Sequence, residues 1–254
     1  MSFHLHPILE TMIALYEQPA SMERFNKYIA LLQGNTKGDM VVPIGGYNPM
    51  GKEHVLQKLL ELKKLNAESV AAEVLEKING KIGNRNQPDF KVVLNLSDDL
   101  KGGWTNRYTS DYDSKFRIHA LITRNFCTPV FWSGEEYTVE QIAVRVAEYC
   151  FRTIYRATHA QPESLRDHVE QEVSVFQSVS GLFPDARAES LPATAYPTLH
   201  AYYQQHQDST DYLTIFNFFY GDEASVSLGH VTRGIEIAFA GYKYAASVKM
   251  RTGI

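Results

Sequence analysis

The sequence predicts a mainly α-helical protein with a small β-sheet, an α+β fold in a single compact soluble domain. Apolar residues recur with the period of a helix over most of the chain, whereas residues 89–99 alternate as a strand does. Hydrophobic residues make up 44% of the 254 residues and charged residues 21%, which is typical of globular proteins. We expect one domain over residues 1–254, with a helical N-terminal part, residues 1–84, packed on the remainder as the alternative subdivision.

The first third of the chain has the pattern of four helices. Pro7 precedes the first helix, which ends before Pro19, and Ser21 is in position to cap the second. The third helix follows the segment 45–54, and the fourth ends near Gly80. The second helix has its apolar residues on one side: Met22, Phe25, Ile29 and Leu32.

The rest of the chain continues this helical pattern. Residues 138–158 give the clearest helix, because their apolar positions follow the i, i+3, i+4, i+7 rule. A further helix follows Pro162. The remaining apolar segments are shorter: we expect helices over 198–207 and 235–246, a strand over Leu213–Tyr220, and either a strand or a helix over 116–132.

Charge and hydropathy exclude two classes of partner. The formal net charge is −4 and the pI is about 6.1. Non-specific binding to nucleic acid needs an excess of Lys and Arg, so we expect no nucleic-acid partner. The longest strongly apolar run, residues 212–221, is about half the length that spans a bilayer. The N-terminus lacks the basic start of a signal peptide, and we expect no membrane partner.

The two cysteines predict a reducing compartment. Cys127 and Cys150 are far apart in the sequence and form no CxxC motif, so we expect no disulfide framework. Cys150 lies on the apolar face of the predicted helix 138–158, and apolar neighbours of Cys127 disfavour a reactive thiolate. A cytoplasmic protein is the prediction.

The segment GGYNPMGKEH, Gly45 to His54, comes close to a nucleotide phosphate loop. Gly46, Gly51 and Lys52 have the required spacing, but Glu53 stands where that loop needs Ser or Thr to hold Mg²⁺. We therefore interpret the segment as a turn that opens the third helix. Its functional alternative is an anion site, formed by the helix N-terminus and Lys52.

Residues 101–113, KGGWTNRYTSDYD, form part of a long polar and aromatic stretch that we expect to be irregular, and such segments tend to be functional. Aromatic rings offer stacking faces, and Arg107 offers a fork for a carboxylate or phosphate. With the segment 45–54, this stretch predicts a ligand pocket lined by Lys52, Trp104, Asn106, Arg107, Tyr108, Asp111 and Asp113. The alternative is a loop packed by its own aromatic rings, with Arg107 paired to Asp111 or Asp113.

No metal site is predicted. The pairs Asp111–Asp113 and Asp98–Asp99 each supply too few oxygen ligands. His168 and Glu172 lie four residues apart on a predicted helix, where we expect an exposed pair.

Three functions agree with these observations. The first is an intracellular protein that binds a small anionic or aromatic ligand at segments 45–54 and 101–113. If it is an enzyme, its acid and base groups come from Asp98, Asp99, Asp111, Asp113, His54 and His119. The second is a non-catalytic interaction or scaffold protein that uses its aromatic segments, including residues 196–206, as a partner surface. The third is a Mg²⁺-dependent nucleotide enzyme. The sequence identifies neither a cofactor nor a reaction, and it leaves a homo-oligomer open.

Overall fold

The computed structural model describes residues 1–36, 38–82, 88–100, 105–186 and 191–252. Within them the chain is mainly α-helical with a small parallel sheet, which confirms the predicted fold class. The chain divides into two compact units, Met1–Thr153 and Ile154–Ile254. The predicted helical part, residues 1–84, stays a prediction. Among the helices in the described ranges, none combines the length and the apolarity needed to cross a membrane.

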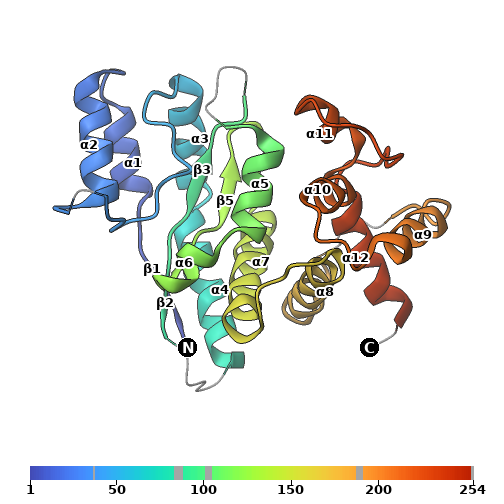
Figure 1. Ribbon diagram of the computed structural model, residues 1–254. Helices are drawn as coiled ribbons and strands as arrows, with labels where there is room; N and C mark the ends of the chain where they lie inside the picture. Colours follow the sequence, from blue (N-terminus) through green and yellow to red (C-terminus); the bar gives the residue numbers. More distant parts are fainter. Residues whose placement is uncertain (37, 83–87, 101–104, 187–190, 253–254) are drawn as a thin grey trace. The chain divides into compact units, whose positions relative to one another are not determined.

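All strands of the described residues lie in the first unit and run parallel (Figure 1). One sheet has the order β1-β2-β4 and another pairs β3 with β5. Backbone hydrogen bonds from Val93 to Cys127 and from Asn95 to Pro129 continue the ladder from one sheet to the next. The strands are short: β1 (Phe3–Leu5), β2 (Phe90–Val92), β3 (Asn95–Ser97), β4 (Phe126–Cys127) and β5 (Val130–Trp132).

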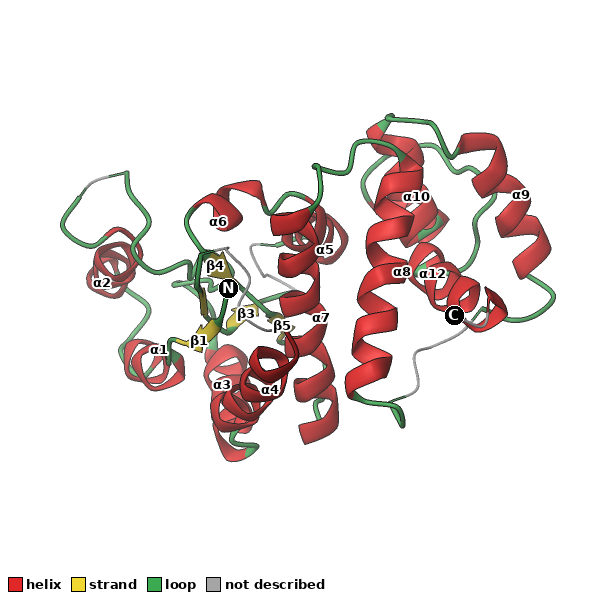
Figure 2. Ribbon diagram, turned by 90° about the horizontal axis from the view of Figure 1, so that it is seen from below, coloured by secondary structure: helices red, strands yellow, loops and turns green. Residues whose placement is uncertain are grey.

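Helices provide the crossovers that parallel strands require. Four helices separate β1 from β2: α1 (Leu9–Tyr16), α2 (Met22–Gln33), α3 (Glu53–Lys64) and α4 (Ala67–Ile82). Two more connect β3 to β4: α5 (Arg107–Phe116) and α6 (His119–Thr123). The long helix α7 (Val139–Thr158) follows β5. Figure 2 shows the strands enclosed by helices of this unit.

This topology brings two polar strand ends together. The strand predicted over residues 89–99 is present as β2 and β3, and it ends in Ser97 and Asp98. Because β3 and β5 are parallel and Ser97 pairs with Trp132, Asp98 and Ser133 follow at the same edge of the sheet. Ligands of open parallel sheets bind at this carboxyl edge.

The apolar side of α2 is only partly buried, and its cap is the predicted one. Ser21 accepts a hydrogen bond from the backbone N–H of Arg24, as expected. However, the residues that α2 buries are Arg24 and Tyr28, while Met22 is 66% exposed. Apolar periodicity missed this face because the buried side chains are a cation and a phenol, which hydrogen bond to backbone carbonyls.

The described residues of the second unit form helices and the loops that join them, with no strand. It contains α8 (Leu165–Leu182), α9 (Tyr196–His206), α10 (Tyr212–Tyr220), α11 (Asp222–Ser227) and α12 (Ala240–Thr252). A capping box of Ser164 and Asp167 starts α8. Gly241 of α12 lies directly against Phe219, where a Cβ atom would meet the ring at 2.7 Å.

Two predictions in this unit are corrected. The run Leu213–Tyr220 is not a strand but most of α10, which begins at the side-chain cap Asp211. Burial on every side removed the period that distinguishes a helix. His168 and Glu172 are not an exposed pair, because both side chains are buried. Burial lowers the pKa of His168.

Candidate functional site

The segment 45–54 is held against the strands by side chains that reach backbone groups. Asn95 of β3 accepts a hydrogen bond from the N–H of Gly46 and donates one to the carbonyl of Pro43. The hydroxyl of Tyr47 donates to the carbonyl of Leu94 at 2.8 Å. At Gly46 the strand is so close that a Cβ atom would lie 2.8 Å from the Ser97 hydroxyl. The turn therefore has a fixed position at the sheet.

The opposite side of the same turn is held by Arg24, which is only 4% exposed. Its guanidinium donates to the carbonyls of Pro49 at 2.7 Å, Gly51 at 2.9 Å and Gln18 at 2.9 Å. Burial lowers the pKa of this group. This buried charge fixes the path of the chain into α3, since the carbonyls of Pro49 and Gly51 would lose their donor if the turn moved.

The internal hydrogen bonds of the turn identify it as a turn and not as a phosphate cradle. The N–H groups of Met50 and Gly51 both point back to Asn48, to its side chain and its carbonyl respectively. The N–H of Gly46 is bound to Asn95. A phosphate loop needs such groups to converge on the ligand, and here three of them have partners within the protein.

His54, in the first turn of α3, faces Asp98 at the end of β3. Nε2 of His54 lies 2.8 Å from Oδ1 of Asp98. The Asp98 side chain is 2% exposed, whereas that of His54 is 27% exposed. An ionised carboxylate only accepts hydrogen bonds, so Nε2 is the donor, and in the neutral ring Nδ1 carries the free lone pair. This arrangement gives a fixed acceptor nitrogen on a ring that solvent can reach.

Ser133, at the end of β5, connects Asp98 to its neighbour Asp99. The Ser133 hydroxyl lies 2.7 Å from Oδ1 of Asp98 and 3.3 Å from Oδ1 of Asp99. The N–H of Gly134 also donates to Asp99 at 2.8 Å. Asp98 and Asp99 thus both accept hydrogen bonds from the loop that follows β5.

Asp99 begins a chain of ion pairs that ends on α7. Arg107 donates to Asp99 at 2.7 Å through Nη1 and to Glu135 through Nη2. Glu135 in turn pairs with Arg145 at 2.7 Å and accepts from the Tyr137 hydroxyl at 2.6 Å. The Arg107 guanidinium also lies 4.3 Å from the ring centroid of Trp132. Both Nη atoms of Arg107 are therefore engaged by carboxylates of the protein itself.

This network shifts the pKa of its members. Burial alone would raise the pKa of Glu135, but the charges of Arg145 and Arg107 lower it to about 2. Burial raises the pKa of Tyr137. Burial alone would lower the pKa of Arg107, but Glu135, Asp111 and Asp99 raise it. Burial also opposes the shift of Arg145, whose pKa is raised by Tyr137 and Glu135. All four groups keep their ordinary charges at neutral pH.

The structure places the predicted ligand residues that it describes on α5 and at the start of α3. The expected irregular stretch is wrong from Arg107 onward, because α5 begins there with Asn106 as its cap. Asp111 is buried and pairs with Lys115, while Asp113 pairs with Arg117 on the outside of the same helix. The alternative prediction paired Arg107 with Asp111 or Asp113, but its ion pairs are with Asp99 and Glu135.

The remaining predicted residues lie at different places. Lys52 is the exposed residue that precedes α3, and Tyr108 is half-buried in the first turn of α5. Trp104 lies outside the described residues. Within the ranges that are described, no three His, Cys, Asp or Glu side chains are grouped to hold a metal ion. Of the two predicted segments, the structure brings His54 and Arg107 to the same strand end, through Asp98 and Asp99.

The aromatic residues of α9 also have partners inside their own unit. Tyr196 and Tyr203 lie 5.5 Å and 5.3 Å from the ring of Tyr244 on α12, measured between centroids. The predicted partner surface over residues 196–206 thus contains rings that are packed in the helical unit. Its role in an interaction stays a prediction.

Sequence reasoning did not single out Ser133, Glu135, Asn95 or Arg24. A signal for two of them exists, because LNLSDD and VFWSGEE are both apolar runs that end in Ser followed by acidic residues. Comparison of the chain with protein-family models, with curated proteins and with solved structures gave no match.

Proposed function

We propose that the protein binds a small polar molecule with an anionic group at the carboxyl edge of its parallel sheet, and that His54, oriented by Asp98, accepts a proton there. The hydrogen bond between these two side chains carries the proposal. A partly exposed histidine that is held by a buried carboxylate is the arrangement of a general base. This refines the predicted small-molecule site to one end of the sheet.

The orientation of the imidazole follows from its single partner. Asp98 fixes the ring by accepting from Nε2, and within the described residues Nδ1 has no hydrogen-bond partner. A neighbouring carboxylate stabilises the imidazolium that forms when Nδ1 takes up a proton. His54 can therefore accept a proton from a bound hydroxyl, from water, or from an acidic C–H group of the ligand.

Ser133 is not the nucleophile of a serine hydrolase in this arrangement. In a Ser-His-Asp relay the hydroxyl donates to the histidine, whereas the Ser133 hydroxyl donates to Asp98. Its role in the proposal is to hold the carboxylate. The proton that His54 accepts comes from the ligand or from water.

The start of α3 supplies the anion-binding part of the site. No side chain caps the first turn of this helix, and Lys52 precedes it. The N–H groups of Glu53 and His54 at the helix start, together with a lysine, attract a carboxylate or a phosphate, whereas the N–H of Val55 is bound to the carbonyl of Lys52. The Glu53 carboxylate does not fill the anion site at the helix start, because it accepts a hydrogen bond from Gln57, one turn farther along the helix. A ligand anion at this end lies one residue from His54 along the chain.

A ligand screen with two matched pairs of variants tests the proposal. Small anionic metabolites are screened against the protein by ligand-observed NMR, and each hit is titrated against His54→Ala and Lys52→Ala. His119→Ala is the control for the first, because α6 leads into the amino end of β4. Lys64→Ala is the control for the second, since Lys64 is exposed at the opposite end of α3.

We expect both site variants to weaken binding at least about tenfold, which corresponds to about 1.4 kcal/mol, while both controls bind as the wild type does. Hits that bind all five proteins equally would place the site elsewhere. The proposal keeps the cytoplasm as the compartment and treats the scaffold function as the alternative, which a screen without any hit would favour.

A further inference from the structure

Cys127 and Cys150 are neighbours in the folded protein, although they are far apart in the sequence. Cys127 is in β4 and Cys150 is on α7, and their Sγ atoms lie 4.0 Å apart. Both are free thiols and both are buried. A disulfide needs the sulfurs about 2 Å closer. If the two side chains share this movement, each sulfur moves by about 1 Å, which rotation of the side chains can supply.

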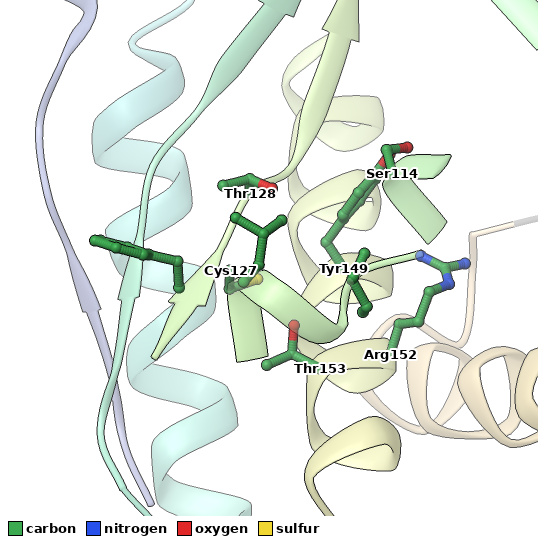
Figure 3. A pocket seen from close by; sticks show the side chains of 9 residues that line it. Ser114, Cys127, Thr128, Tyr149, Arg152 and Thr153 are labelled. Atoms are coloured by element: carbon green, nitrogen blue, oxygen red, sulfur yellow. The ribbon is translucent and has the colours of Figure 1, made fainter. Parts of the chain in front are cut away.

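A small cavity adjoins one member of the pair. It has room for about one water-sized molecule, and Cys127 belongs to its lining. Figure 3 shows the other labelled side chains: Tyr149, Arg152 and Thr153 come from α7, Thr128 follows β4, and Ser114 comes from α5. Cys150 is not in the lining. A small oxidant that enters the cavity therefore meets Cys127 first.

We propose that Cys127 and Cys150 form a reversible disulfide within one chain when the native protein meets a peroxide. Cys127 is the thiol that lines the cavity, and Cys150, whose sulfur lies 4.0 Å from that of Cys127, is the second thiol. An oxidised cysteine with a thiol beside it condenses to a disulfide, whereas an isolated one is oxidised further. Two buried sulfurs in contact provide this arrangement without a CxxC motif.

The reaction balances with hydrogen peroxide as the oxidant. The sulfur of Cys127 attacks one peroxide oxygen, an S–O bond forms, the O–O bond breaks, and the departing hydroxide leaves as water with the thiol proton. The sulfur of Cys150 then attacks Sγ of Cys127. The S–S bond forms, the S–O bond breaks, and a second water leaves with the proton of Cys150. Two electrons pass from the two thiols to the peroxide.

The surroundings of Cys150 agree with its role as the second thiol. Burial raises the pKa of the Cys150 thiol, and the contact with Cys127 raises it further. A protonated thiol is a poor first nucleophile, which agrees with Cys150 acting second. Closure of the disulfide joins β4 directly to α7, the helix that supplies Arg145 to the ion-pair network.

Intact-protein mass spectrometry tests the proposal on the native wild-type chain. The protein is treated with hydrogen peroxide, the excess is removed with catalase, and the chain is then unfolded and exposed to iodoacetamide. We expect a loss of about 2 Da, the two thiol hydrogens, with no alkylation and no dimer. A reductant restores both alkylatable thiols, and peptide mapping identifies the bond between Cys127 and Cys150.

A matched variant tests the order of the two steps. In Cys150→Ser the oxidised Cys127 has no partner, so dimedone traps its sulfenic acid, while the wild-type protein escapes the trap. Two alkylated thiols in peroxide-treated wild-type protein would overturn the proposal, as would a disulfide between chains or oxygen added to Cys127 alone. These wild-type outcomes decide the question even if the variant does not fold, and none depends on the proton-transfer role of His54.

Discussion

Nε2 of His54 lies 2.8 Å from Oδ1 of Asp98, although 44 positions separate them in the chain. Hydrogen bonds from Asn95 and Tyr47 hold the turn before α3 against the strands and so bring His54 to Asp98. Asp98 is buried and accepts hydrogen bonds from both His54 and Ser133. The carboxylate is thereby fixed, and it fixes the imidazole in turn.

Replacement of this carboxylate is expected to release the ring. Asp98→Asn keeps the shape of the side chain but removes its charge, so Nε2 of His54 loses a charge-assisted acceptor. We expect the Nε2–H tautomer to dominate in the wild type and to give way to a mixture in the variant, as measured by long-range ¹H–¹⁵N correlation spectra. The free energy of unfolding should fall by about 1.5–3 kcal/mol.

Asp208→Asn is the control for this substitution, since Asp208 is exposed and pairs only with Arg166 among the described residues. It should leave the spectrum of His54 unchanged. The same tautomer in the wild type and in Asp98→Asn would show that Asp98 does not orient the ring.

Two adjacent glycines should respond differently to the same change. In Gly46→Ala the new Cβ atom would meet the hydroxyl of Ser97 at 2.8 Å, whereas at Gly45 nothing lies within 4 Å. We expect Gly46→Ala to lower the free energy of unfolding by about 1–3 kcal/mol, and Gly45→Ala to change it by less than about 0.5 kcal/mol. Urea denaturation of both variants measures the difference, and equal effects would mean that the turn does not contact β3.

The buried guanidinium of Arg24 is expected to contribute strongly to stability. Arg24→Leu leaves the carbonyls of Pro49 and Gly51 without their donor, at a cost of about 3 kcal/mol or more. Hydrogen exchange of the Met50 and Gly51 amides should become faster, because the turn is released. Arg124→Leu, on an exposed residue, should change the urea midpoint little. A stable Arg24→Leu protein with slow exchange at both amides would contradict this role.

The ion pairs of Glu135 predict a loss of stability in acid. Because Arg145 and Arg107 overcome the effect of burial, the pKa of Glu135 falls from 4.5 to about 2 on folding. A lowered pKa stabilises the folded state fully above the unfolded value, and this contribution is lost as pH falls from about 4.5 to about 2. At neutral pH it amounts to about 3 kcal/mol at most.

Denaturation of the wild type and Glu135→Gln across this pH range measures the contribution. The difference in unfolding free energy should be largest above pH about 4.5 and should shrink as pH falls toward about 2. Glu140→Gln, on an exposed residue of α7, provides the control and should follow the wild type throughout. A difference that does not depend on pH would mean that the effect of Glu135 is one of packing and not of charge.

Local signals predicted the helices that have one apolar face and a cap. The cap at Ser21 and the period of α7 are examples. Periodicity gave the wrong answer for α10, which is buried on all sides, and for α5, which is mostly polar. Tyr212–Tyr220 is buried nearly throughout, and α5 is so polar that only its cap, Asn106, marks its start.

The site could be predicted only in part, because it depends on strand pairing. Asp98 and His54 both stood among the candidate acid and base groups, but nothing in the sequence joins them. Ser133 reaches Asp98 only because β5 pairs with β3 in parallel. Such a contact is a property of the topology, which no local pattern contains.

The hydroxyl of Ser133 carries a single hydrogen, and two carboxylates lie within its reach. It can donate to Asp98 or to Asp99, but not fully to both at once. A change in the charge of His54 alters how strongly Asp98 competes for that hydrogen, and Asp99 experiences the result. Through the rotation of one O–H bond, the imidazole at the sheet edge and the ion pairs that extend to α7 act as a single coupled electrostatic unit.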